Sequence, residues 1–137
     1  MIFDELYQYS LHDTDLTDFS FDAIENRFVL EFKNGIYNYS HDPMQHEDNT
    51  TKKCKLYISV KKVNKIKEIL TITRYATKER NINIKALNNN IKKYGLEIDN
   101  WFLSKVNNSI MLYAYYTRGG FNIKISHCTK VEYIFED

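Results

Sequence analysis

The chain is poor in the residues that staple or interrupt small domains. Its 137 residues include two Cys, one Pro and four Gly. Cys54 and Cys128 are far apart in the sequence, and two cysteines cannot supply the disulfide framework typical of small secreted domains. We therefore expect two buried thiols in a reducing compartment, which makes the chain cytoplasmic.

Membrane and export signals are also lacking. Residues 1–15 contain acidic residues, among them Asp4, Glu5 and Asp13, and neither the basic start nor the apolar run of a signal peptide. The longest uncharged stretch, 106–117, is too short to cross a bilayer. The sequence predicts a protein that is neither secreted nor inserted in a membrane.

The usual signatures of enzymes are missing as well. No P-loop, G-x-S-x-G or H-E-x-x-H string occurs, and Gly119-Gly120 fits a hairpin turn rather than a phosphate loop. Cys128 follows His127, but neighbours on a strand point to opposite faces and cannot form a nucleophile–base pair. We expect no catalytic residue, no cofactor and no enzymatic activity.

Histidines beside acids invite a metal or general-base interpretation. His12 precedes Asp13, and His41 and His46 lie in an acidic stretch with Asp42 and Asp48. A metal site needs three or four converging ligands, which adjacent residues do not provide. We expect no metal, while a small hydrolase with a His/Asp site in residues 40–53 stays open as a weaker hypothesis.

Length and composition favour one domain. With 43% hydrophobic and 15% aromatic residues, 1–137 can bury a real core as a single unit without a structural metal. Abundant Phe, Tyr and Trp argue against disorder.

Apolar residues alternate with polar ones along most of the chain, which is typical of half-buried strands. The alternation predicts a hairpin of 16–24 with 27–32, a second of 54–61 with 66–75, and a third of 109–117 with 121–126 turning at Arg118-Gly119-Gly120. Further strands are expected at 36–39, 96–105 and 131–135. Residues 40–53 lack this period and read as a long exposed loop.

One segment has helical spacing. Ile84, Leu87 and Ile91 lie three and four residues apart, and Gly95 is a typical helix stop. Three consecutive Asn (88–90) are poor helix formers, so this helix must depend on packing its apolar stripe against a sheet. The expected fold is α+β: a mostly antiparallel sheet of about seven or eight strands with one mid-chain helix on a face.

Charge is strongly segregated along a chain that is nearly neutral overall. Residues 1–50 hold 11 acids and 2 bases, residues 51–95 hold 13 bases and 2 acids, and the remainder nearly balances. One interpretation is that the two segments pair with each other across strands. The other is an exposed acidic face that docks a cationic partner. That face would contain Asp13, Asp15, Asp18, Asp22, Glu25 and Glu31.

The basic segment suggests an alternative function. Lysines at positions 52–67 flank Tyr57 and could follow the phosphates of a nucleic acid. The stretch has no base-reading motif, and the near-neutral chain weakens the interpretation. A nucleic-acid-binding module that uses this Lys-rich hairpin remains the alternative.

The order of several short motifs resembles small bacterial proteins of Gram-positive type that begin with an L-H-D-S/T element. The motifs are Leu11-His12-Asp13-Thr14, the strand-Gly-aromatic unit 30–37, Ala86-Leu87-Asn88, and the acidic strand 96–99. Several such proteins are similar to immunity proteins of polymorphic toxin and contact-dependent growth inhibition systems. The resemblance implies a non-enzymatic cytosolic inhibitor whose partner is one cognate toxin domain, with His12 and Asp13 shaping the first turn rather than catalysing.

Overall fold

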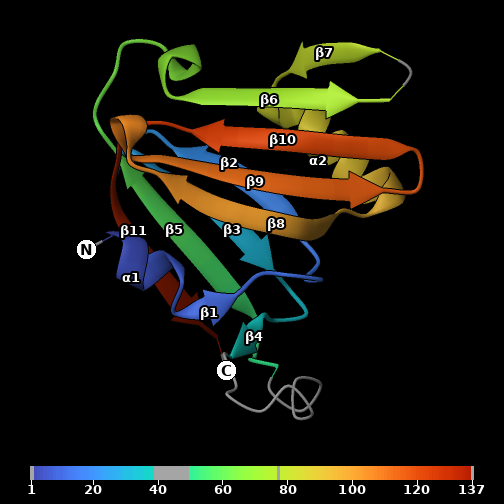
Figure 1. Cartoon of the computed structure of the whole chain (residues 1–137), viewed down its shortest axis with the longest axis horizontal. Helices are drawn as coiled ribbons and strands as arrows, with labels where there is room; N and C mark the ends of the chain where they lie inside the picture. The colour runs from blue at the N-terminus through green and yellow to red at the C-terminus, as the bar shows by residue number, and fades with distance from the viewer. Residues whose placement is uncertain (1, 39–49, 77, 137) are drawn as a thin grey trace.

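The computed structural model describes residues 2–38, 50–76 and 78–136. They form 11 strands in three antiparallel sheets with one main helix (Figure 1). The α+β class with antiparallel pairing is confirmed, whereas the strands are more numerous than predicted and divide into separate sheets. Most of the predicted 40–53 loop lies outside the described residues.

A four-stranded sheet carries the acidic hairpin. Its order is β11-β5-β3-β2, formed by β2 (Asp18–Asp22), β3 (Arg27–Phe32), β5 (Cys54–Val60) and β11 (Cys128–Phe135). The strict alternation of buried and half-buried residues along β3 and β5 is the predicted one. The hairpin of β2 with β3 is confirmed, with Phe19 opposite Leu30.

A five-stranded sheet holds most of the second half of the chain. Its order is β7-β6-β10-β9-β8, formed by β6 (Leu70–Tyr75), β7 (Glu79–Ile82), β8 (Glu97–Ser104), β9 (Ser109–Tyr116) and β10 (Gly119–Ile125). The β9–β10 hairpin is confirmed, but Tyr116 pairs with Gly119, so the turn itself is Thr117-Arg118. Gly119 has φ 156°, and a Cβ there would lie 2.0 Å from the Tyr75 carbonyl oxygen.

The predicted hairpin between 54–61 and 66–75 is wrong. β5 pairs with β3 and β11, while β6 pairs with β7 and β10 in the other sheet. Between them the chain forms the 3-10 helix η2 (Ile66–Glu68), which replaces the start of the predicted second strand. Alternation shows which face of a strand is buried, but not which strand pairs with it.

Helix α2 (Ile84–Tyr94) has the bounds that the sequence predicts. The Asn83 side chain caps its start by accepting from the Ala86 N–H, and Gly95, at φ 73°, ends it. Leu87 and Ile91 are buried, as the apolar stripe requires. In Figure 1 the helix lies behind the β6–β10 part of the five-stranded sheet.

Several short elements were not predicted. They are α1 (Ile2–Leu6), β1 (Tyr9–Ser10) and the 3-10 helix η3 (Val106–Asn108), along with β7. β1 pairs with β4 (Tyr37–Asn38), which falls inside the predicted 36–39 strand, as a separate two-stranded sheet. Elements of two to five residues are too short to show a period.

The two large sheets share one hydrophobic core. In Figure 1 their strands cross at different directions, the four-stranded sheet behind the five-stranded one. Side chains from both, such as Phe28 and Leu56 from one and Leu112 and Ile123 from the other, belong to a single buried cluster. Among the described residues, no helix combines the length and apolarity needed to span a membrane.

Candidate functional site

The segment 13–16 lies along the first residues of β8 and extends the five-stranded sheet locally. The Asp13 N–H donates to the Ile98 carbonyl oxygen at 2.8 Å, and the Ile98 N–H donates to the Thr14 carbonyl oxygen at 2.9 Å. The Leu16 N–H donates to the Leu96 carbonyl oxygen at 2.9 Å. Thr14 and Leu16 are buried between these contacts, whereas Asp13 and Asp15 are exposed. The sequence alternation thus places both acids on the solvent side.

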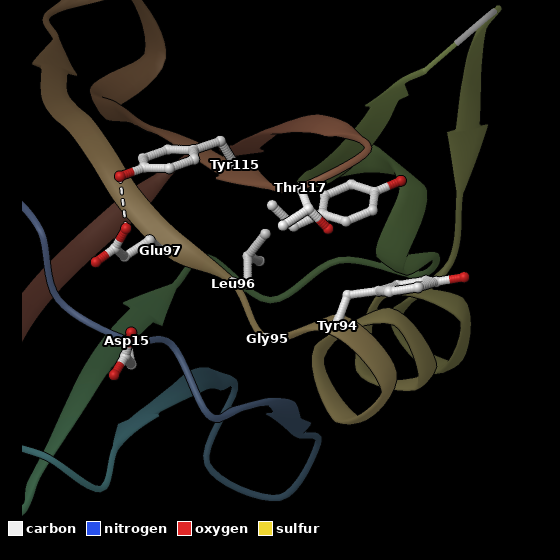
Figure 2. Close-up of a pocket in the computed structure, with 8 residues that line it drawn as sticks. Asp15, Tyr94, Gly95, Leu96, Glu97, Tyr115 and Thr117 are labelled. Atoms are coloured by element: carbon white, nitrogen blue, oxygen red, sulfur yellow. Dashed lines mark hydrogen bonds between the residues drawn. The ribbon is translucent and has the colours of Figure 1, made fainter.

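A row of polar side chains crosses three chain segments on this outer face. Asp15 is paired with Glu97 through the backbone, in an antiparallel β-bridge, and Glu97 is opposite Tyr115 on β9. The Tyr115 hydroxyl donates to Glu97 Oε2 at 2.5 Å (Figure 2). Asn34 Nδ2 donates to Asp15 Oδ2 at 2.9 Å. The hydrogen bond to Glu97 and the surrounding negative charges raise the pKa of Tyr115 to about 12.

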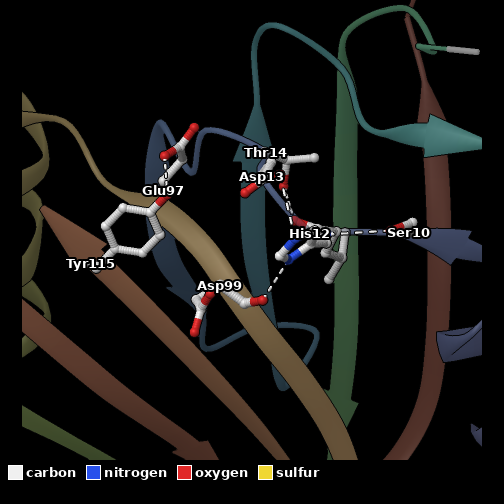
Figure 3. A network of polar contacts seen from close by, with 8 residues as sticks. Ser10, His12, Asp13, Thr14, Glu97, Asp99 and Tyr115 are labelled. Atoms are coloured by element: carbon white, nitrogen blue, oxygen red, sulfur yellow. Dashed lines mark hydrogen bonds and ion pairs between the residues drawn. The ribbon is translucent and has the colours of Figure 1, made fainter. Parts of the chain in front are cut away.

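His12 and Asp99 complete the group. His12 Nδ1 lies 2.7 Å from the Asp99 carbonyl oxygen, and its Nε2 lies 3.3 Å from Asp13 Oδ2 (Figure 3). The register of β8 shifts between Ile98 and Asn100, so Asp99 is the extra residue of a bulge. We call Asp13, Asp15, Glu97 and Asp99, together with Tyr115, the acidic surface.

A pocket of about 280 Å³ opens at one end of the acidic surface. Asp15 and Glu97 supply carboxylates, and Tyr115 supplies an aromatic ring (Figure 2). Carboxylates beside the faces of aromatic rings are the environment that a Lys or Arg side chain prefers, through ion pairs and cation–π contacts. The pocket can therefore receive a cationic side chain from a partner.

Of the six predicted partner-binding acids, the structure brings two together on this surface, Asp13 and Asp15. Asp22 Oδ1 accepts hydrogen bonds from the backbone N–H groups of Ile24 and Glu25, and Asp22 Oδ2 lies 3.6 Å from Arg27 Nε. The Asp22 side chain thus binds backbone N–H groups in the turn that follows β2.

The other predicted acids belong to the hairpin. Glu31, with a side chain 17% exposed, pairs with Lys53 Nζ at 3.1 Å and is opposite Asp18 across the strands. Glu25 is exposed in the turn.

The interpretation that the acidic and basic segments pair with each other holds for part of them. Glu31 on β3 is opposite Lys55 on β5, and both Lys53 and Lys55 also reach Glu136, at 3.4 and 3.2 Å. These ion pairs raise the pKa values of both lysines and lower that of Glu136. Lysines 61–67 are exposed around η2, so the Lys-rich hairpin on which the nucleic-acid hypothesis was based is not formed.

Glu97, Asp99 and Tyr115 were not predicted to act together with the N-terminal acids. The acidic strand 96–99 and the hairpin of 109–117 with 121–126, which contains Tyr115, were both predicted from the sequence. The pairing of 13–16 with β8 was not predicted, because a segment of four residues is too short to show an alternation of its own in the sequence.

The structure tests the thiols and part of the histidine hypotheses. Cys54 and Cys128 are 0% and 2% exposed, and burial raises the pKa of each thiol to about 12. No three potential metal ligands gather anywhere in the described ranges, whereas His41, Asp42, His46 and Asp48 lie outside them.

Comparisons of this chain with protein families, with curated proteins and with solved structures find no match.

Proposed function

We propose that this chain is a non-enzymatic binding protein, an immunity protein that neutralises a cognate toxin domain by covering a cationic region of it with the acidic surface. The observation that carries the proposal is the acidic surface itself. Four carboxylates from two distant parts of the sequence converge around Tyr115 beside a pocket suited to a Lys or Arg side chain.

The state of these charges supports docking. Asp15 and Glu97 accept hydrogen bonds from neutral donors, Asn34 and Tyr115, which hold the carboxylates in place without cancelling their charge. In the described part of the chain, Asp15, Glu97 and Asp99 form no ion pair. A fixed, uncompensated negative patch accelerates encounter with a basic protein and determines its orientation.

The aromatic ring adds a contact of another kind. Tyr115 is 42% exposed and is held by its bond to Glu97. Tyrosines and arginines are enriched among the residues that dominate protein–protein affinity. An arginine of the toxin that binds between Tyr115 and Asp15 would combine the charge attraction with the aromatic contact. If that arginine belongs to the active site of the toxin, its engagement by this chain would explain neutralisation.

The proposal is tested by rescue from toxicity. Each protein domain encoded next to the gene of this chain is expressed in a bacterial host, alone and together with the chain. We expect one such domain to arrest growth and this chain to restore it. If this chain relieves the growth arrest caused by none of these domains, the proposal is wrong.

Charge removal tests the role of the surface. In the triple variant Asp13→Asn, Asp15→Asn, Asp99→Asn, side-chain shapes are kept and three charges are lost. The matched control, Asp4→Asn, Glu68→Gln, Glu79→Gln, removes three charges from exposed positions outside the acidic surface. We expect rescue to fail or weaken only with the first variant. Equal rescue by both would exclude docking through this surface.

A further inference from the structure

We propose that the pocket formed by Arg74, Asn89, Asn90, Lys93 and Tyr94 binds a phosphoryl group. It shares Tyr94 with the pocket of the acidic surface but has no other lining residue in common with it, and it is independent of the proposed function. Its volume is about 210 Å³. Sites for whole drug-sized ligands measure roughly 300–1,000 Å³, so this pocket fits one charged group rather than a complete cofactor.

The position of Arg74 is fixed by a buried aromatic stack. Its Nε and Nη2 donate to the Tyr116 hydroxyl at 3.1 and 2.9 Å, which leaves the other donors of the guanidinium for a ligand. Tyr116 is 8% exposed and packs between Tyr94 and Phe121, with ring centroids 5.3 and 5.4 Å away. An arginine held this way loses little entropy when it binds an anion.

Further cations surround the same rings. Lys93 Nζ lies 5.1 Å from the centre of the Tyr94 ring, and Arg118 Cζ lies 5.7 Å from it. Arg80 is the direct cross-strand partner of Arg74, and like charges in that arrangement repel each other. None of these four cations forms an ion pair with a carboxylate in the described segments.

The chemistry favours a phosphoryl ligand. The Lys93 hydrogen bond and the positive charges of Lys93, Arg118 and Arg74 lower the pKa of Tyr94, as expected where the same cations favour an anion. In the pocket itself the Arg74 guanidinium and the Lys93 ammonium match the several oxygens and the double charge of a phosphate, and the Asn89 and Asn90 amides provide neutral partners. An anion here would also relieve the repulsion between Arg74 and Arg80.

The test is a titration of the whole chain with inorganic phosphate, followed by amide chemical shifts, with chloride at equal ionic strength as the reference. We expect saturable shifts at residues 89, 90 and 93. The double variant Arg74→Met, Lys93→Met should weaken binding at least about tenfold, equivalent to ~1.4 kcal/mol. Lys85→Met, on the same helix but outside the pocket, should leave the affinity unchanged.

A second variant distinguishes loss of phosphate binding from loss of the folded structure. Tyr116→Phe keeps every charge and removes only the hydroxyl that holds Arg74, so it should weaken phosphate binding while thermal unfolding shows a folded chain. A mononucleotide and a single-stranded RNA oligonucleotide are titrated in parallel. Binding of the oligonucleotide alone, lost in the double variant, would assign the phosphoryl group to a nucleic-acid backbone. Absence of binding by all three probes, or binding that the double variant retains, would overturn the proposal.

Discussion

Acidic residues of similar sequence context have different surroundings in this chain. Glu31 is neutralised by Lys53, and Asp22 is engaged by two backbone N–H groups and by Arg27. Asp13 and Asp15 lie on the same N-terminal segment but face solvent, next to Glu97 and Asp99. The count of acids in a segment therefore overstates the charge that it can offer to a partner.

The two cysteines give a first test at the residue scale. Because both thiols are buried and burial raises the pKa of each to about 12, neither forms a thiolate at neutral pH in the folded chain. We expect no reaction with Ellman's reagent under native conditions and reaction of both thiols in denaturant. Rapid modification of either thiol in the native chain would contradict the burial described here.

Tyr115 and Tyr94 make opposite predictions for alkaline titration. The pKa of Tyr115 is raised to about 12, so its phenol stays protonated in the fold where an ordinary tyrosine ionises, near pH 10. The stabilisation from the Tyr115–Glu97 hydrogen bond is therefore complete below pH 10 and is lost as the pH rises through 12. The pKa of Tyr94 is lowered from the same ordinary value.

Tyrosinate absorbance separates the two rings. Tyr94→Phe should remove the part of the titration that occurs below the ordinary tyrosine pKa, and Tyr115→Phe should remove part of the latest ionisation. The reverse order would mean that the local charges are not as described.

At the scale of elements, α2 does more than cover a sheet. Asn88 Oδ1 accepts the Phe19 N–H at 3.0 Å, and Asn88 Nδ2 donates to the Phe19 carbonyl oxygen at 2.6 Å. One side chain thus satisfies both backbone groups of a residue on the edge strand β2, as a neighbouring strand would. This contact is a reason for the helix to contain an Asn where Ala would form a better helix.

Asn88→Ala should destabilise the protein by about 1–3 kcal/mol, because two partly buried backbone groups lose their partner. Asn89→Ala, at the exposed neighbouring position, is the matched control and should be neutral or slightly stabilising, since Ala is the better helix former. Urea unfolding of both variants measures the difference. Equal stability of the two would show that the Asn88 contacts contribute nothing.

The local sequence pattern predicted the helices and strands better than it predicted which strands pair with each other. The bounds of α2 and β3 follow from apolar spacing together with Gly95 and the short turn predicted between residues 24 and 27, all of which act within a few residues. The pairing of β5 with β11 joins residues more than 60 positions apart, such as Ile58 with Val131, and no local property encodes it. The acidic surface depends on a pairing of the same kind, Asp15 with Glu97, which is why only its N-terminal half was predicted.

At the scale of the whole molecule, charge is divided between surfaces as well as along the chain. Part of the acidic segment is paired with the basic strand β5 in the four-stranded sheet, which ties the two halves of the charge pattern together. Some of the charge that is left unpaired lies near Tyr94, a residue that two pockets share: carboxylates beside Tyr115 in one, and Arg74 with Lys93 in the other. A nearly neutral chain can therefore present a docking surface of each sign.

The most direct test of the proposed function is the association rate with the rescued toxin domain, measured by surface plasmon resonance at increasing salt. The variant Asp13→Asn, Asp15→Asn, Asp99→Asn should associate several-fold more slowly at low salt. Its difference from the wild type should shrink as the Debye length falls below ~8 Å. The control Asp4→Asn, Glu68→Gln, Glu79→Gln should follow the wild type. Equal association rates of the wild type and both variants at low salt would contradict docking through the acidic surface.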